Sequence, residues 1–200
     1  HAALNKVTNS DVYSTEMAEF VETVARIAQP DYLPYAFYVE GGTLAVENAL
    51  KVSFDWKVRK NLAAGKGAKG GKVLHFKDCF HGRSGYTMSL TDSPDPRKTL
   101  YFPKFDWPRV LNPKITFPLD EAAVAEAEIQ SITEIKAAIH ANPDDIAALI
   151  IEPIQGEGGD NHFREEFFRA LRTICDENEI LFIYDEVQTG IGLTGKMWAH

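Results

Sequence analysis

The segment from Ile180 to Gly195 constrains the fold more than any other part of the chain. It opens with the apolar run Ile180–Tyr184, which is rich in strand-forming residues and is followed at once by Asp185 and Glu186. A short apolar run without polar alternation predicts a strand that is buried on both faces, as in a parallel sheet. Open α/β sheets bind ligands beyond the carboxyl ends of their strands, so Asp185 is a candidate site residue. Capping of the following turn is the alternative role for Asp185 at this point.

The rest of the chain alternates between helical and strand patterns. Apolar spacing predicts helices over 14–28, 43–61, 120–140 and 163–175, and apolar runs predict further strands over 36–39, 73–76 and 146–151. The stretch 91–118 is rich in proline and aromatic residues but lacks a period, which indicates a packed excursion. This order predicts an α/β fold with three layers, in which helices cover both faces of a mostly parallel sheet.

Polar or glycine-bearing loops follow the predicted strands. They are Gly41–Thr43, residues 79–85, residues 152–160, and the loop after Tyr184. Because the carboxyl ends of parallel strands lie on one edge, one ligand can contact all of these loops. The Gly-Gly-Thr turn at a helix start offers free backbone N–H groups, which suit a phosphate, although a plain turn is an equal reading.

Composition excludes several partners. The 200 residues carry 21 Lys and Arg against 29 Asp and Glu, a formal charge of −8, and the only cationic cluster, residues 66–72, is interleaved with glycine. Nucleic-acid and anionic-membrane binding need clustered cations, so neither is expected. No apolar run reaches the length of a bilayer, and no metal site is expected. Cys79 and Cys175 form no CxxC pair, which favours a reducing, cytoplasmic location.

The expected edge combines a phosphate cradle, the aromatic ring of Phe80 and the carboxylate of Asp185. A flat, phosphorylated, cationic heterocycle such as pyridoxal phosphate would use all three, because the carboxylate keeps a ring nitrogen protonated. The rival interpretation is a nucleotidase, but Gly67–Lys72 has the wrong spacing for a phosphate-binding P-loop and precedes its strand. A noncatalytic interaction module would leave the converging loops unexplained.

Four segments carry a resemblance to a known family. GGTLAVENALK, FHGRSG, EPIQGEGGD and IYDEVQTGIGLTGKMWA resemble the class-III pyridoxal-phosphate aminotransferases over nearly the whole chain. Within that class, EGGTLAVENALK, FDWKVRKN and YFPKFDWPR resemble the lysine 6-aminotransferases. Most relatives have Ser-Gly where this chain has Gly41-Gly42, and the Gly-Gly form is typical of the lysine enzymes.

The resemblance implies a role for each matching residue. Gly42 and Thr43 would hold the phosphate of pyridoxal 5′-phosphate, Phe80 and Val187 would cover the two ring faces, Gln188 would bind the phenolic oxygen, and Asp185 would pair with the ring nitrogen. The catalytic roles fall to Asp185 and Glu157.

On the substrate side, Arg83 would bind the α-carboxylate of L-lysine. Glu157 would be a gate that neutralises a distant arginine while lysine is bound and moves away when 2-oxoglutarate needs that arginine. Glu152 and His81 would support the site from behind. The implied reaction moves the ε-amino group of L-lysine to 2-oxoglutarate, with ornithine or 4-aminobutyrate as alternative donors, in a homodimer.

The family's Schiff-base lysine is expected beyond the last residue of this chain, because Lys196 stands too early in the motif. Residues 1–200 are therefore expected to be part of the cofactor-binding large domain of the fold-type I enzymes, without the small C-terminal domain. Such a fragment alone would be inactive.

Overall fold

A computed structural model describes residues 14–200 of the chain. It divides into two units, one ending at Tyr38 and the other running from Val39 to His200. Within the described residues, no helix combines the length and the apolar character that a bilayer crossing requires.

The described part of the first unit contains the predicted helix α1, Thr15–Ile27. Ser14 caps it, because its Oγ accepts a hydrogen bond of 3.1 Å from the backbone N–H of Met17. No residue of α1 is buried. The ring of Phe20 meets that of Tyr38 edge to face at 5.7 Å.

The prediction of a strand over residues 36–39 is wrong. These residues are irregular, and no strand within residues 14–200 pairs with them. Apolar side chains in this region face solvent, with Tyr35 93% and Phe37 74% exposed. An apolar run becomes a strand only where a neighbouring strand completes its hydrogen bonds, and none is present in the described chain.

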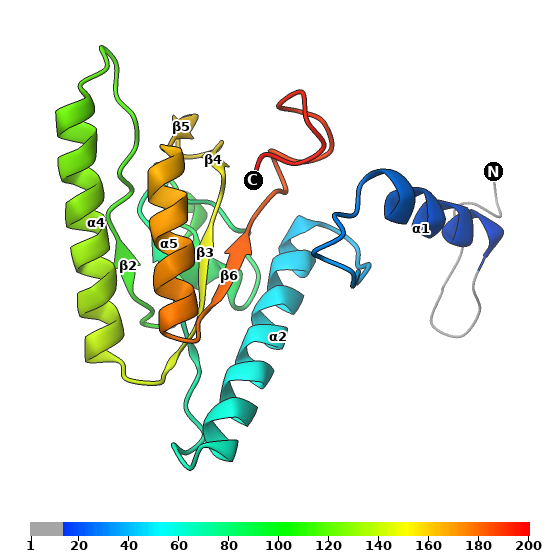
Figure 1. The fold of residues 1–200 in the computed structure, drawn as a ribbon, viewed down its shortest axis with the longest axis horizontal. Helices are drawn as coiled ribbons and strands as arrows, with labels where there is room; N and C mark the ends of the chain where they lie inside the picture. Colours follow the sequence, from blue (N-terminus) through cyan, green and yellow to red (C-terminus); the bar gives the residue numbers. More distant parts are fainter. Residues whose placement is uncertain (1–13) are drawn as a thin grey trace. The chain divides into compact units, whose positions relative to one another are not determined.

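The second unit, drawn in Figure 1, is built on four parallel strands in the order β2-β1-β3-β6. The strands are β1 (Lys72–Phe76), β2 (Arg109–Val110), β3 (Ile146–Ile151) and β6 (Leu181–Tyr184). Leu149 of β3 lies opposite Leu74 of β1 and Phe182 of β6. All six residues of β3 are buried, as expected for a central strand with helices on both sides.

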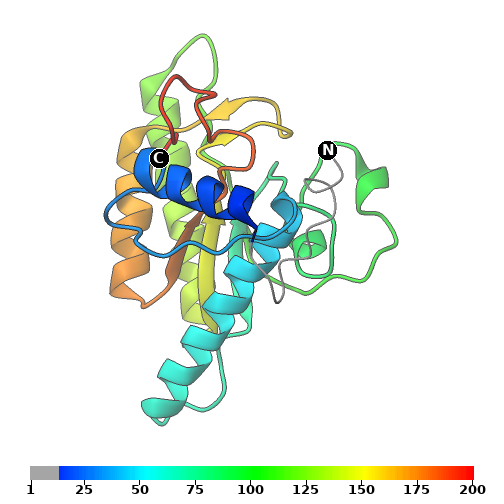
Figure 2. The same cartoon turned by 90° about the vertical axis from the view of Figure 1, so that its right-hand side faces the viewer.

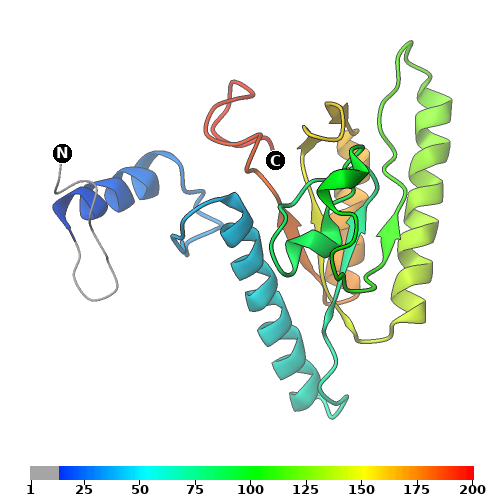
Figure 3. The ribbon, with the colours of Figure 1, turned by 180° about the vertical axis from the view of Figure 1, so that it is seen from behind.

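Helices cover both faces of this sheet. On one face lie α4 (Glu121–Ala141) and α5 (Glu165–Glu177), which share a core with Leu149 and Ile151 of β3. On the other lies α2 (Gly42–Ala63), which Figure 2 shows crossing in front of the strands. The short helix α3 (Thr87–Leu90) packs on the same face, as Figure 3 shows from behind. The predicted three-layer arrangement is confirmed.

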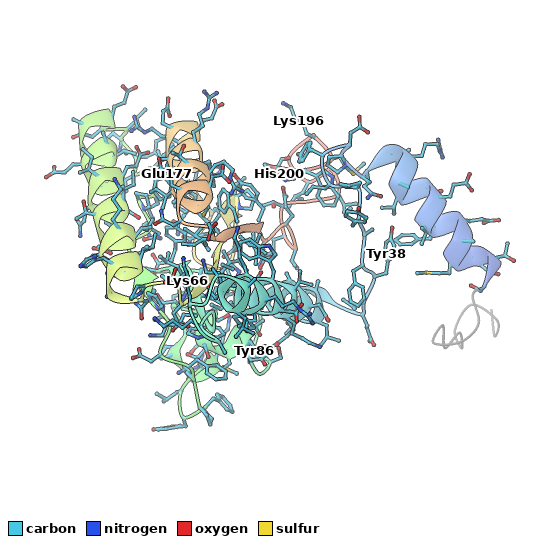
Figure 4. The ribbon with its side chains drawn as sticks, turned by 60° about the horizontal axis from the view of Figure 1, so that its bottom comes forward. Tyr38, Lys66, Tyr86, Glu177, Lys196 and His200 are labelled. Carbon is cyan, nitrogen blue, oxygen red and sulfur yellow. The ribbon has the colours of Figure 1, made fainter. Side chains whose placement is uncertain are left out.

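The aromatic stretch 91–118 is packed only in part, contrary to the prediction, because Tyr101 and Phe117 are 93% and 83% exposed. It also contains the 3-10 turn η1 (Pro96–Lys98) and strand β2. Trp107 is buried and stacks on Phe105 at 5.0 Å. Both rings lie close to Tyr86, which Figure 4 labels beside α2. These rings join the α2 face of the core to the segment that precedes β2.

Lys57 links the two helical layers. Its side chain is buried, although it is charged, and Nζ donates to the carbonyl of Glu179 at 2.8 Å and of Asn178 at 3.4 Å. These carbonyls directly follow α5, where a cation is favoured by the helix dipole. Burial lowers the pKa of Lys57, and the nearby charge of Glu179 opposes that shift.

Candidate functional site

A cavity lies at the carboxyl edge of the sheet. The N-terminal end of α2 and the end of β6 lie at this edge (Figure 1). The cavity lining contains every residue to which the sequence assigned a cofactor contact. The lining residues are Gly42, Thr43, Val46, Phe80, His81, Gly82, Glu152, Asp185, Val187 and Gln188. The predicted convergence is confirmed for the loops after β1, β3 and β6, whereas the Gly-Gly-Thr turn arrives without a preceding strand.

The N-terminus of α2 forms one wall. Gly41 is its N-cap, with φ at 79°, and no side chain caps the first turn. The backbone N–H groups of Gly42 and Thr43 therefore present the positive end of a helix dipole toward the cavity, which is the geometry of an anion site.

Two glycines at this wall are required by close contacts. A Cβ on Gly42 would lie 2.6 Å from Cγ1 of Val187. A Cβ on Gly82, where φ is +105°, would lie 2.5 Å from Oγ1 of Thr43. Both approaches are too short for any larger residue, so the turn before α2, the loop after β1 and the loop after β6 meet only because these positions are glycine.

Asp185 lies at the end of β6, and its backbone N–H continues the ladder to the carbonyl of Ile151 at 2.9 Å. The residue is 6% exposed. Its Oδ1 accepts from the backbone N–H of Val187 at 3.1 Å, and its Oδ2 is 2.7 Å from Nδ1 of His81. The two contacts fix the orientation of the carboxylate toward the loops that line the cavity.

His81 is 2% exposed, and its second ring nitrogen, Nε2, is buried without a hydrogen-bond partner in the described structure. Burial opposes protonation of the ring, but the interactions with Cys79 and Asp185 outweigh it and hold the pKa of His81 well above 6.5. An imidazolium hydrogen-bonded to a carboxylate is a charge-assisted contact in a dry setting. His81 is therefore part of the site rather than an ordinary core residue.

Glu152 holds the loop that carries Phe80. Its Oε1 accepts from the backbone N–H of Phe80 at 2.9 Å, and its Oε2 accepts from that of Gly156 at 3.3 Å. Burial raises the pKa of Glu152, and the charge of His81 counteracts that rise. Glu152 thus ties the loop after β1 to the loop after β3, which agrees with its expected supporting role.

Glu157 lies on the turn between β4 (Ile154–Gln155) and β5 (Asn161–His162), a short antiparallel hairpin that the sequence did not predict. Its carboxylate contacts Lys98 and Ser93 and does not line the cavity. The backbone on both sides is closely packed. A Cβ on Gly156 would lie 2.2 Å from Oε1 of Gln188, and a Cβ on Gly158 would lie 1.9 Å from the carbonyl oxygen of Asp78.

Arg83 and Lys196, like Glu157, lie outside the cavity lining. Arg83 follows Phe80 by three positions on the same loop, but its side chain is exposed. Lys196 is exposed on the loop after β6, as Figure 4 shows.

Sequence reasoning missed Ser93 and Lys98, which hold Glu157. Both belong to the aperiodic stretch 91–118, where the sequence gives no sign of which side chains return to the site. Glu47 was also missed. Its Oε1 accepts from the backbone N–H groups of Tyr86 at 2.8 Å and Thr87 at 3.3 Å, and it orders the segment after Arg83.

Comparison with known proteins gives a consistent answer. The model of the family described as aminotransferase class-III matches residues 2–200. The L-lysine-epsilon aminotransferase of Mycobacterium tuberculosis is 58% identical over 200 residues, and that of Amycolatopsis lactamdurans is 50% identical over 201. Each alignment covers 100% of this chain and 44% of the relative, so the chain spans less than half of their length.

A solved structure described as lysine aminotransferase from M. tuberculosis in the internal aldimine form superposes with a TM-score of 0.95 at 57% identity. The match covers 99% of this chain and 46% of the other. Together with the family match over residues 2–200, it shows that this chain belongs to the class-III aminotransferases.

Proposed function

We propose that the protein to which this chain belongs transfers the ε-amino group of L-lysine to 2-oxoglutarate, giving 2-aminoadipate 6-semialdehyde and L-glutamate. Pyridoxal 5′-phosphate is the proposed cofactor. The observation that carries this proposal is the buried Asp185, which lines one cavity with the aromatic ring of Phe80 and the uncapped N-terminus of α2. The similarity to lysine aminotransferases over the full chain favours lysine as the donor.

The residues of the cavity fit this cofactor. The uncapped start of α2, with Gly42 and Thr43, suits its phosphate, and the carboxylate of Asp185 suits its ring nitrogen. An opposite charge in a site shielded from water favours the protonated form of that nitrogen. When bound, pyridoxal phosphate supplies an electron sink for a carbanion at the substrate carbon.

The other lining residues would restrict the ring. Phe80 and Val187 would cover its two faces, and Gln188 would hydrogen-bond its phenolic oxygen. The close approach of Val187 to Gly42 supports this arrangement, because it places the Val187 side chain beside the proposed phosphate cradle.

Two residues outside the lining would select the substrates. Arg83 would bind the α-carboxylate of lysine and leave the ε-amine at the reacting end. Glu157 would be the gate that lets one site accept a diamine and then a dicarboxylate. The exposure of Arg83 leaves its guanidinium available to a ligand, and the location of Glu157 on a hairpin next to the site is compatible with its role.

Ornithine and 4-aminobutyrate are the alternative donors, since the geometry of the described residues does not separate them from lysine. A nucleotidase is disfavoured by the position of the rejected phosphate-loop candidate, Gly67–Lys72. This segment follows the C-terminal end of α2 (Figure 1), whereas the cavity is lined by residues at the N-terminal end of that helix.

We also propose a homodimer and a cytoplasmic location. The dimer is supported by large, exposed apolar side chains that lie close together in the chain, because exposed apolar surface is typical of interaction sites. These side chains are Tyr32, Leu33, Tyr35 and Phe37. The free, buried thiols of Cys79 and Cys175 support a reducing compartment.

The decisive experiment uses the purified full-length protein. It should show a visible absorption band that changes when L-lysine is added, and glutamate should form when 2-oxoglutarate follows. Ornithine and 4-aminobutyrate, tested in parallel, should give a smaller kcat/KM. A colourless protein that hydrolyses nucleotides would overturn the proposal, and a larger kcat/KM for ornithine would reassign the donor.

Asp185→Ala in the full-length protein should abolish turnover and largely spare the fold, because it removes the partner of the ring nitrogen. Steady-state kinetics and far-ultraviolet circular dichroism check the two halves of this prediction. More than about a tenth of the wild-type rate, a loss of under roughly 1.4 kcal/mol in transition-state stabilisation, would contradict the role of Asp185.

A further inference from the structure

Glu157 is held by two side chains from a distant part of the sequence. Nζ of Lys98, the last residue of η1, forms an ion pair with Oε1 of Glu157. The hydroxyl of Ser93 donates to the same oxygen at 2.9 Å. Neither partner is close to Glu157 in the chain, so the contact is tertiary and belongs to the folded site.

This contact is partly shielded from solvent. The side chains of Lys98 and Glu157 are 33% and 26% exposed. The hydrogen bonds from Lys98 and Ser93 lower the pKa of Glu157, so the carboxylate is charged at neutral pH. Salt screens a partly shielded ion pair less than a fully exposed one. The hydroxyl of Ser93 contacts the same carboxylate oxygen as Lys98 and helps to fix its position.

The cation also borders the candidate site. Nζ of Lys98 is 5.8 Å from the ring centroid of Phe80, which lines the cavity. An ammonium group at this distance from an aromatic ring is attracted by the ring's electrons. Lys98 is therefore fixed between the aromatic wall of the cavity and the carboxylate of Glu157.

We propose that Lys98 and Ser93 form the receptor that holds Glu157 away from the site and so make the site competent for the dicarboxylate substrate. This inference rests on the gate role in the proposed function. Moving a carboxylate away from one cation into a partly dry environment is unfavourable unless other hydrogen-bond donors contact it there. Lys98 and Ser93 supply those donors, and their strength sets the fraction of molecules in which Glu157 is withdrawn.

The test measures both half-reactions of the full-length protein in single-turnover experiments with Lys98→Met, which keeps most of the apolar stem and removes the charge. The apparent dissociation constant for 2-oxoglutarate should rise about fivefold, equivalent to roughly 1 kcal/mol, because Glu157 is no longer held away. The lysine half-reaction should keep its rate within about twofold, a change of at most roughly 0.4 kcal/mol. Ser93→Ala should act in the same direction with a smaller effect.

Arg97→Met is the matched control. Arg97 is the neighbouring cation in η1, but it pairs with Asp95 on the exposed side of the turn. It should change neither half-reaction. A general role of Lys98 in folding the turn would instead reduce both half-reactions together, and that result would overturn the inference.

A double-mutant cycle with Glu157→Ala shows whether Lys98 acts through Glu157. Lys98→Met should have no further effect on 2-oxoglutarate binding once Glu157 is absent. A full additional loss in that background would mean that Lys98 contacts the substrate directly, and the receptor role would be wrong. Failure of the proposed function itself is detected separately, because the wild-type protein would then transfer no amine from lysine.

Discussion

Contacts of single residues at the carboxyl edge fix the geometry of the candidate site. One carboxylate oxygen of Asp185 accepts a hydrogen bond from the backbone N–H of Val187, and the other is hydrogen-bonded to the ring of His81. His81 is the less expected partner, since the sequence indicated only a supporting role for it. Its raised pKa makes it a cation in the folded protein, and the pair therefore contributes to stability in a way that depends on pH.

His81→Asn should destabilise the full-length protein by about 3 kcal/mol near pH 5, where carboxylates are still ionised, because it breaks a buried charged pair. A group whose pKa is raised by folding stabilises the protein fully below its unfolded value, about 6.5 for histidine, and loses this effect as pH rises through the folded value. The difference in unfolding free energy between wild type and variant should therefore shrink with rising pH. Urea denaturation at a series of pH values measures it.

His75 provides the control for that experiment. It is equally buried, but burial and the charge of Arg109 lower its pKa to about 3, so it stays neutral near pH 7. His75→Asn should give a loss of unfolding free energy that grows as pH rises toward the unfolded value of about 6.5 and is constant above about pH 7.5, because only the unfolded state binds a proton in that range. The pH dependence therefore has the opposite sign for the two variants, and a difference for His81→Asn that stays constant or grows with pH would contradict the ionic pair.

The sequence identified Asp185, Phe80 and the Gly-Gly-Thr turn, because strand ends and glycine turns leave local signals. It could not show why Gly42 and Gly82 must be glycine. The groups that exclude a side chain there, Val187 and Thr43, come from other segments. It also could not place Lys98 beside Glu157, since that contact depends on how an aperiodic stretch folds back.

At the scale of elements, apolar periodicity predicted α1, α2, α4 and α5 to within a few residues, and apolar runs predicted β1, β3 and β6. The two-residue strands β2, β4 and β5 were missed, because so short a segment has no period. The false strand at 36–39 shows the reverse error. It has a strand-like sequence, but no strand of the described chain pairs with it.

Lys57→Met should reduce the free energy of unfolding by about 1–3 kcal/mol, because the carbonyls of Asn178 and Glu179 would lose their buried donor. Chemical denaturation of the full-length protein, followed by circular dichroism, measures this loss. Lys60→Met is the control. Lys60 pairs with the side chain of Glu179 in solvent, and such surface pairs contribute about 0–1 kcal/mol. Equal losses in the two variants would contradict the capping role of Lys57.

At the scale of the whole molecule, the parallel topology is what made the convergence of the loops predictable. Parallel strands place their carboxyl ends on one edge, so loops far apart in the sequence had to converge there. No comparable rule predicts the assembly state from the sequence. Exposed apolar side chains are the guide to an interface, and several of them lie within Tyr32–Phe37.

Tyr35→Glu combined with Phe37→Glu should weaken the proposed homodimer of the full-length protein, because the variant places charges on an apolar surface. Sedimentation equilibrium should show a dimer dissociation constant raised at least about tenfold, or roughly 1.4 kcal/mol. Phe117→Glu is the control, since Phe117 is an equally exposed aromatic residue on the second unit. An unchanged dimer in the double variant would remove this surface from the interface.

The tight packing around the hairpin turn limits how Glu157 can move. At Gly158 the Asp78 carbonyl, and at Gly156 the Gln188 amide, come so close that neither position has room for a Cβ, which restricts the main chain on those two sides. A change of partner by Glu157 would therefore come mainly from rotation about its own side-chain bonds, which takes nanoseconds or less when a side chain is not enclosed. Alternation between two unlike substrates would then never wait for a flap to open.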